Sequence, residues 1–181
     1  TVSADGTVKG IKKGSVAITI KAYNGLTRTV ALTVVDAPAS VRLSAQEINV
    51  VKTNAAGYEF RLLAWIGTER AMNLRWTSSD ETVVTVENGV LTGARRGTAT
   101  VTATTYNGKT ASCIVHVYNE PTGIRLSSDE LTIYEDMTAT LKVIFADGEW
   151  SPVEFISANE EIAEVTSEGR VTGMLAGTTE I

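Results

Sequence analysis

Apolar and polar residues alternate along most of the chain, which is the pattern of β-strands with one buried face. The clearest runs place Ala99, Val101 and Ala103 before Asn107-Gly108, and Cys113 and Val115 after it. An Asn-Gly pair between two such runs predicts a β-hairpin with a type I′ turn, in which both residues have positive φ. Because no window shows a convincing helical period, the pattern predicts an all-β fold of antiparallel sandwiches.

The same pattern recurs at a nearly constant spacing. Gly93, Tyr106 and Pro121 each lie 83 positions after a matching residue, namely Gly10, Tyr23 and Pro38. In the other direction an offset of 80 brings matching residues onto the later part of the chain: Gly89, Thr92, Gly93, Gly97 and Thr98 onto Gly169, Thr172, Gly173, Gly177 and Thr178. A period of this length with small insertions and deletions indicates tandem modules.

The period divides the chain into three units. Residues 1–38 correspond to the C-terminal part of a module, residues 39–121 form a complete module, and residues 122–181 correspond to the N-terminal part of a third. The linkers, residues 36–40 and 119–122, are short and contain proline. We therefore expect the modules to lie end to end, in a rod-like array with limited bending.

Within the complete module we expect two edge strands, at 41–43 and 48–50, before the core strands. The following core strands are expected at Tyr58, Phe60, Leu62 and Ala64, at Leu74 and Trp76, at Val84 and Val86, and at 90–92. In the third unit, Leu131 and Ile133, then Leu141, Val143 and Phe145, then Val153 and Phe155, repeat the early strands.

The two end units each lack strands that the complete module has, so each is expected to expose an apolar sheet face. Two interpretations follow. In the first, the chain is a segment of a longer polypeptide that completes both units. In the second, one chain's first unit completes another chain's last, as in donor-strand exchange. The first is preferred because equivalents of 85–101 occur in both end units, which makes the fit between chains imperfect.

The motifs of the complete module resemble those of the bacterial immunoglobulin-like domain family, group 2. The resemblance rests on four segments, which are 41–44 (VRLS), 76–80 (WTSSD), 86–93 (VENGVLTG) and 97–103 (GTATVTA), and it extends over three copies. The third copy departs from it, with Phe155 in place of Trp76. The resemblance implies immunoglobulin-like β-sandwiches that serve as spacer or adhesive modules of bacterial surface proteins and of bacteriophage virions. It supplies no catalytic residues.

Composition narrows the classes of function. The 181 residues are 43% apolar and 20% charged, which is enough for packed cores and unlike disordered chains. A net charge of −5 argues against nucleic acid as a partner, since that partner requires a basic face. No apolar run approaches the roughly 18 residues of a membrane helix, and the single cysteine forms no disulfide within the chain.

Four residues are predicted to lie in the core of the complete module: Trp76, Val101, Cys113 and Val115. Trp76 follows Leu74 on the strand where immunoglobulin sandwiches bury a tryptophan. Cys113 occupies the position of Val30 in the first unit, which indicates a thiol that packs as a small apolar side chain rather than a reactive one.

Residues with catalytic or ligand-binding chemistry are few. His116, the single histidine, alternates away from the core and is interpreted as a surface residue. Acidic clusters at 79–81, 128–130 and 159–161 could bind calcium, but their spacing matches no EF-hand and turns favour the same residues. Arg95-Arg96 is interpreted as a solubilising turn. We expect no metal site and no cofactor.

Trp65 and Trp150 lie outside the core alternation, each near a turn. Exposed aromatic rings stack on sugars or form contacts with protein partners, so both are candidates for ligand contact. Equally, they cap a sandwich end or pack between modules.

The sequence therefore predicts a non-enzymatic spacer or adhesion protein on a bacterial cell surface. Its partners would be neighbouring modules of the same polypeptide and, for adhesion, a cell-surface carbohydrate or protein. The alternative is a fibre or decoration module of a bacteriophage particle that binds host glycans. Neither role requires nucleic acid or insertion into a membrane.

Overall fold

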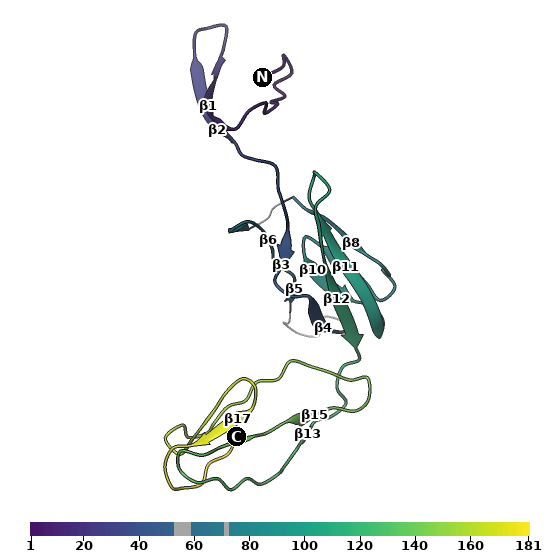
Figure 1. Ribbon diagram of the computed structural model, residues 1–181, viewed down its shortest axis with the longest axis vertical. Helices are drawn as coiled ribbons and strands as arrows, with labels where there is room; N and C mark the ends of the chain where they lie inside the picture. The colour runs from purple at the N-terminus through teal and green to yellow at the C-terminus, as the bar shows by residue number, and fades with distance from the viewer. Residues whose placement is uncertain (53–58, 71–72) are drawn as a thin grey trace.

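The computed structural model of the chain describes residues 1–52, 59–70 and 73–181, and these residues form strands and no helix. Three units follow one another along the long axis of the molecule (Figure 1). The prediction of an all-β fold is confirmed.

The second unit is a sandwich, and its larger sheet has four strands. In spatial order they are β4 (Glu47–Val51), β12 (Thr110–Tyr118), β11 (Gly97–Thr104) and β8 (Arg75–Ser78). β11 pairs with β12 along its whole length, from Gly97 opposite Val117 to Thr104 opposite Thr110. β4 runs parallel to β12, which departs from the purely antiparallel sandwich that the sequence predicted.

Short strands form the opposite layer. They are β3 (Arg42–Leu43), β6 (Ala64–Ile66) and β7 (Glu69–Arg70) in one group, and β5 (Phe60–Arg61), β10 (Val90–Gly93) and β9 (Val84–Glu87) in the other. The predicted edge strands at 41–43 and 48–50 correspond to β3 and β4, which lie at the edges of their sheets. Tyr58 lies outside the described residues.

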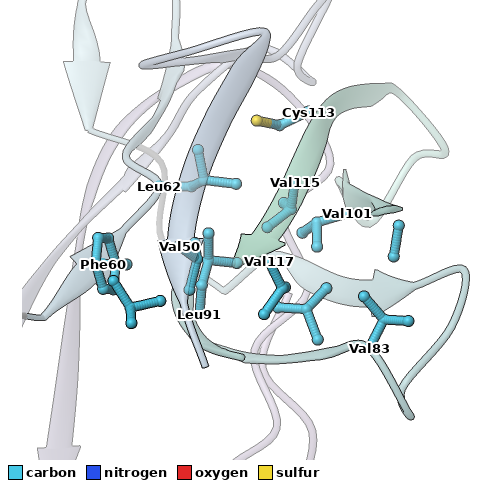
Figure 2. Close-up of a cluster of buried hydrophobic side chains, with 12 residues drawn as sticks. Val50, Phe60, Leu62, Val83, Leu91, Val101, Cys113, Val115 and Val117 are labelled. Atoms are coloured by element: carbon cyan, nitrogen blue, oxygen red, sulfur yellow. The ribbon is translucent and has the colours of Figure 1, made fainter. Parts of the chain in front are cut away.

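The core lies between these two layers (Figure 2). Val101 and Val115 from the larger sheet are fully buried, as are Val84 and Leu91 from the opposite layer. Cys113, at the edge of the cluster, is only 1% exposed. Each fully buried side chain of this kind contributes about 1.5–3 kcal/mol, so the β11–β12 hairpin supplies much of the module's stability.

Trp76 is less central than the sequence suggested. It packs against the core but is only half buried, and its strand β8 is at the edge of the larger sheet. The ring lies over the β9–β10 turn, where a Cβ added to Gly89 would be 3.2 Å from Trp76 Cζ2.

In the first unit, β1 (Gly14–Lys21) and β2 (Thr27–Val34) form the predicted hairpin, from Gly14 opposite Val34 to Lys21 opposite Thr27. The apolar face of this hairpin is exposed: Val16 and Val30 are each 55% accessible.

The three Asn-Gly turns differ from one another. Asn88 and Gly89 have φ of +51° and +84°, as a type I′ turn requires. At Asn24-Gly25 and Asn107-Gly108 only the glycine has positive φ, so the type I′ prediction is wrong there. Gly25 N donates to Ala22 O and Ala22 N to Leu26 O, which describes a longer loop that ends in a left-handed glycine.

The third unit has five short strands. β13 (Arg125–Leu126) pairs with β15 (Val143–Ile144), and β17 (Arg170–Gly173) lies between β14 (Thr138–Thr140) and β16 (Ala163–Val165). Leu141, Ala163 and Val171 form its small core.

The strands predicted around Ile133 and Phe155 do not form, although both side chains pack against that core. Their counterparts in the second unit are β4 and β8, which pair with β12 and β11. In the part of the chain that the structure describes, no such hairpin lies beside Ile133 and Phe155. Isolated strands have no ladder to join, so these segments stay irregular.

Candidate functional site

Aromatic contacts, backbone hydrogen bonds and an ion pair join the second and third units. Trp150 follows the Asp147-Gly148 turn of the third unit and packs against the core of the second. The centroid of its ring lies 6.3 Å from that of Phe60, at the start of β5, and 6.3 Å from that of Tyr118, at the end of β12. Both ring pairs are tilted, an arrangement that aromatic rings favour at these distances.

Backbone hydrogen bonds hold the chain on either side of this tryptophan. Asn119 N donates to Gly148 O at 2.9 Å, and Trp150 N donates to Asn119 O at 3.2 Å. Glu149 accepts hydrogen bonds from Thr122 N at 3.1 Å and from Thr122 Oγ1 at 2.9 Å. The linker is therefore hydrogen-bonded to the third unit at Gly148, Glu149 and Trp150.

An ion pair also crosses the junction. Arg96 Nη2 lies 3.2 Å from Asp147 Oδ2, and both side chains are at least half exposed. Exposed pairs of this kind contribute at most about 1 kcal/mol, so the ion pair orients the junction more than it stabilises it. The sequence interpretation of Arg96 as a solubilising residue missed this contact, because Asp147 is distant in sequence.

The two candidate ligand-contact residues have different surroundings. Trp150 is half buried between modules, which was one of the alternatives to ligand contact. Trp65 is half buried on β6, opposite Arg42 of β3, and the Arg42 guanidinium carbon lies 4.4 Å from the centroid of its ring. Ligand contact by Trp65 stays a prediction.

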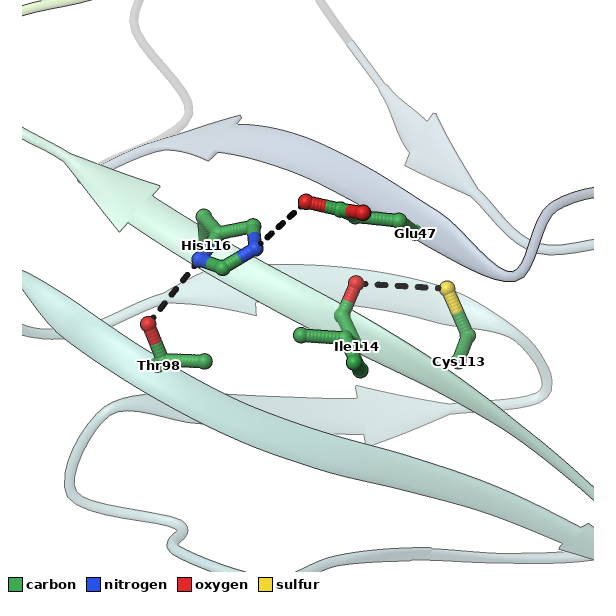
Figure 3. Close-up of polar contacts among 5 residues, drawn as sticks. All are labelled: Glu47, Thr98, Cys113, Ile114 and His116. Atoms are coloured by element: carbon green, nitrogen blue, oxygen red, sulfur yellow. Dashed lines mark hydrogen bonds and ion pairs between the residues drawn. The ribbon is translucent and has the colours of Figure 1, made fainter.

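His116 connects three strands on the outer face of the larger sheet (Figure 3). Its Nδ1 lies 2.9 Å from Thr98 Oγ1 on β11, and its Nε2 lies 2.8 Å from Glu47 Oε1 on β4. The side chain is 27% exposed, so His116 points away from the core as predicted but is less solvated than a free surface residue. The contacts among Thr98, His116 and Glu47 help to hold the edge strand β4 on the sheet.

Cys113, on the same strand as His116, faces the core. Its Sγ lies 3.5 Å from the carbonyl oxygen of Ile114 (Figure 3). Burial, with a smaller contribution from the charge of Glu47, raises the pKa of the thiol to about 11. The nucleophilic thiolate is therefore scarce at neutral pH.

The acidic clusters act within their own turns. Asp80 Oδ1 accepts hydrogen bonds from Thr82 N at 2.9 Å and Thr82 Oγ1 at 2.6 Å. These bonds lower the pKa of Asp80, the Thr82 hydroxyl most. Asn159 accepts the equivalent bond from Glu161 N at 3.0 Å. No group of three or more metal-ligating side chains occurs among residues 1–52, 59–70 and 73–181.

Sequence reasoning did not identify the surface that receives Trp150. Tyr118 is the last residue of β12, just beyond the alternating run, and Phe60 was assigned simply to a core strand. One signal was present: three aromatic residues, Phe60, Tyr118 and Trp150, each stand at the boundary of a strand or turn. Their proximity became visible only in the folded chain.

The family model described as "Bacterial Ig-like domain (group 2)" matches residues 39–115 and 121–181. The two matches together include most of the chain and agree with tandem repeats. No curated protein matches the chain.

Three solved structures resemble the chain over most of its length. One is surface layer protein SbsC, domains 1–6, with 18% identity and a TM-score of 0.35; it covers 97% of this chain and 34% of that one. The others are protocadherin gammaB7 structures: domains EC3–6 as a cis-dimer (14% identity, TM-score 0.34, 91% of this chain and 51% of that one) and extracellular cadherin domains 1–4 (12%, 0.37, 94% and 58%). This chain thus spans a third to somewhat over half of their lengths, and scores this low support no inference about function.

In the part of the chain that the structure describes, no helix has the length and apolarity needed to cross a membrane.

Proposed function

The chain belongs to the group 2 family of bacterial Ig-like domains, and from that premise we propose that it is a non-enzymatic structural segment of a bacterial cell-surface protein. Its role is to hold neighbouring domains at a set distance and direction, as a spacer that carries adhesive parts of the protein away from the cell. The observation that carries this proposal is the packed junction at Trp150.

A spacer must resist bending at its junctions. Two aromatic pairs, each contributing about 0.5–1.5 kcal/mol beyond the area they bury, oppose rotation of the third module about the linker. The Asn119 backbone bonds shorten the free linker, and the Arg96–Asp147 pair restricts twisting. These contacts join the second and third modules.

Small-angle X-ray scattering of dilute protein tests the proposal. We expect the wild type to fit one extended arrangement of the second and third modules. Trp150→Ala removes both ring contacts and should broaden the distribution of angles between these modules. Trp65→Ala is the matched control: it removes a half-buried tryptophan of the second module that is not part of the junction. A Trp150→Ala variant as rigid as the wild type contradicts the proposal.

Location and adhesion need separate measurements. Antibodies against the second module should label intact bacteria that carry the parent protein. Labelling confined to purified virions would support the bacteriophage alternative instead. Binding of the wild type to a cell-surface glycan, lost in Trp65→Ala and retained in Trp150→Ala, would show that the spacer is also adhesive.

A further inference from the structure

An arginine lies over a tryptophan on the outer face of one short sheet of the second unit. This sheet contains β3, β6 and β7, with Arg42 opposite Trp65 in one ladder and Trp65 opposite Arg70 in the next. Ala64, the neighbour of Trp65 on β6, is only 4% exposed and faces the core, so alternation places Trp65 on the outer face. β3 and β6 lie on the flank of the unit away from β8 (Figure 1).

The ring orders the Arg42 guanidinium without neutralising it. The central carbon of the guanidinium lies 4.4 Å from the centroid of the Trp65 ring, within the range of a cation–π contact. Arg42 is exposed, and no ion pair to it occurs among residues 1–52, 59–70 and 73–181. By contrast, Arg61 of β5 pairs with Glu59. Because a cation–π contact uses the face of the ring and no hydrogen bond, the N–H donors of Arg42 stay available to a ligand.

The chemistry of this pair fits a carboxylate carried on a sugar. A planar guanidinium donates two parallel hydrogen bonds to one carboxylate, and a cation that is already ordered loses little entropy on binding. The half-buried Trp65 and Leu63, which alternation puts on the same face, supply apolar surface for the C–H face of a sugar ring. Densely charged polyanions fit less well, because their binding needs several cations and this chain has a net charge of −5.

The third unit has the arginine without the tryptophan. Arg125 of β13 stands opposite Ile144 of β15, as Arg42 stands opposite Trp65. Ile144 is 44% exposed, so the equivalent position of the third unit also faces outwards. Arg125 therefore keeps the charge at the matching place but stands opposite an aliphatic side chain, which makes it an internal control for the ordered arginine.

We propose that the Arg42–Trp65 pair binds a carboxylate-bearing polysaccharide, with Arg42 holding the carboxylate and Trp65 contacting the sugar ring that carries it. The site goes beyond the spacer role and gives the second module a class of ligand. It is independent of that role, which depends on the junction at Trp150. A variant can therefore lose ligand binding and keep the rigid junction, so the two proposals fail in separate experiments.

Titration calorimetry of the full chain with an oligogalacturonate of defined length tests the proposal. The matched ligand is the methyl ester of the same oligosaccharide, which has the same sugar rings but no charge. We expect the acid to bind the wild type at least about tenfold more tightly than its ester, because only the acid forms charge-assisted hydrogen bonds. Binding of the acid should also weaken at high salt, which screens an exposed charge pair.

Substitutions at the two arginines separate this site from general surface charge. Arg42→Gln removes the donor fork and should weaken binding of the acid at least about tenfold. Arg42→Lys should recover only part of the affinity, because an ammonium group lacks the planar fork. Arg125→Gln removes the same charge from the equivalent position and should leave the affinity close to that of the wild type. Trp65→Phe should weaken binding less than Trp65→Ala, since it keeps an aromatic ring beneath Arg42. Urea unfolding of each variant shows that the second module is folded.

Three results would overturn the proposal. One is a wild type that does not bind the oligogalacturonate, or that binds its methyl ester equally well. Another is an affinity unchanged in Arg42→Gln, or lowered equally by Arg42→Gln and Arg125→Gln, in variants whose second module is folded. The last is binding of a polyglutamate peptide with the same number of carboxylates as tightly as the oligogalacturonate, which would indicate an acidic protein as the partner instead.

Discussion

The second and third modules share one sequence pattern but form different sets of strands. Both contain the same hairpin, β9–β10 in one and β16–β17 in the other. In both, a leucine amide donates to a turn glycine: Leu62 N to Gly89 O and Leu141 N to Gly169 O, each at 2.8 Å. A Cβ on either glycine would overlap the leucine carbonyl oxygen, so both turns require glycine.

The modules differ at the strands that depend on distant partners. Val50 of β4 is fully buried, whereas its counterpart Ile133 is half buried and in no strand. The β9–β10 and β16–β17 hairpins pair residues that are close in sequence, and closing such short loops costs little entropy. β4 and β8 instead depend on a hairpin that follows them along the chain. The comparison shows that an alternating sequence specifies which face is buried, but a strand forms only when its partner is present.

The largest expected difference is in hydrogen exchange. In dilute protein, amides of β4 should exchange at least about a thousandfold more slowly than those of residues 130–134, because β4 opens only with the module. Mass spectrometry of exchanged peptides measures both segments in one sample. Equal protection of the two segments would mean that residues 130–134 form a strand without a partner.

Matched leucines test how well each core is packed. Leu62→Ala should destabilise the second module by about 3–5 kcal/mol, since the side chain is 2% exposed and leaves a cavity. Leu141→Ala should cost the third module about 2 kcal/mol, because Leu141 lines an open groove of that module and its loss leaves less enclosed space. Urea unfolding, monitored by hydrogen exchange of peptides from each module, gives both values. Equal losses would show that the third core is packed as tightly as the second.

Cysteine labelling extends the comparison to the first unit. At pH 8, the pKa of about 11 makes the Cys113 thiolate about a hundredfold scarcer than in an ordinary cysteine, so native labelling should be slow and should accelerate on unfolding. The control is Val30→Cys with Cys113→Val, which places the thiol at the equivalent position of the exposed hairpin. Rapid labelling of native Cys113 would contradict its placement in the core.

The smallest effect is expected at low pH. The pKa of Asp80 is lowered from 3.8 by hydrogen bonds from Thr82, so its ionised form favours the folded module. This contribution is present above pH 3.8 and is lost as the pH falls through the lower folded value. Asp80→Asn should therefore reduce the acid sensitivity of the second module, as Asn159 already does at the equivalent position of the third. Thermal melts from pH 2 to 6 measure this effect. If the melting temperature of Asp80→Asn falls with decreasing pH as steeply as that of the wild type, the prediction is contradicted.

The sequence by itself determined the repeat, the all-β class and the inward face of β11 and β12. Ala99, Val101 and Ala103 are buried because a strand alternates its side chains between two faces, and that alternation is a local property. The positions of the hairpin turns were equally local, although the turn types at Asn24-Gly25 and Asn107-Gly108 depended on loop length, which a dipeptide does not fix.

Tertiary structure alone decided the parallel pairing of β4, the half burial of Trp76 and the role of Trp150. Each depends on which element lies next to it in space: β12 beside β4, no further strand beyond β8, and the Phe60–Tyr118 surface beneath the third module's turn. Such contacts join residues distant in sequence, so no local pattern encodes them. The irregular segments at Ile133 and Phe155 have the same physical reason, since backbone donors and acceptors form a ladder only against a second strand.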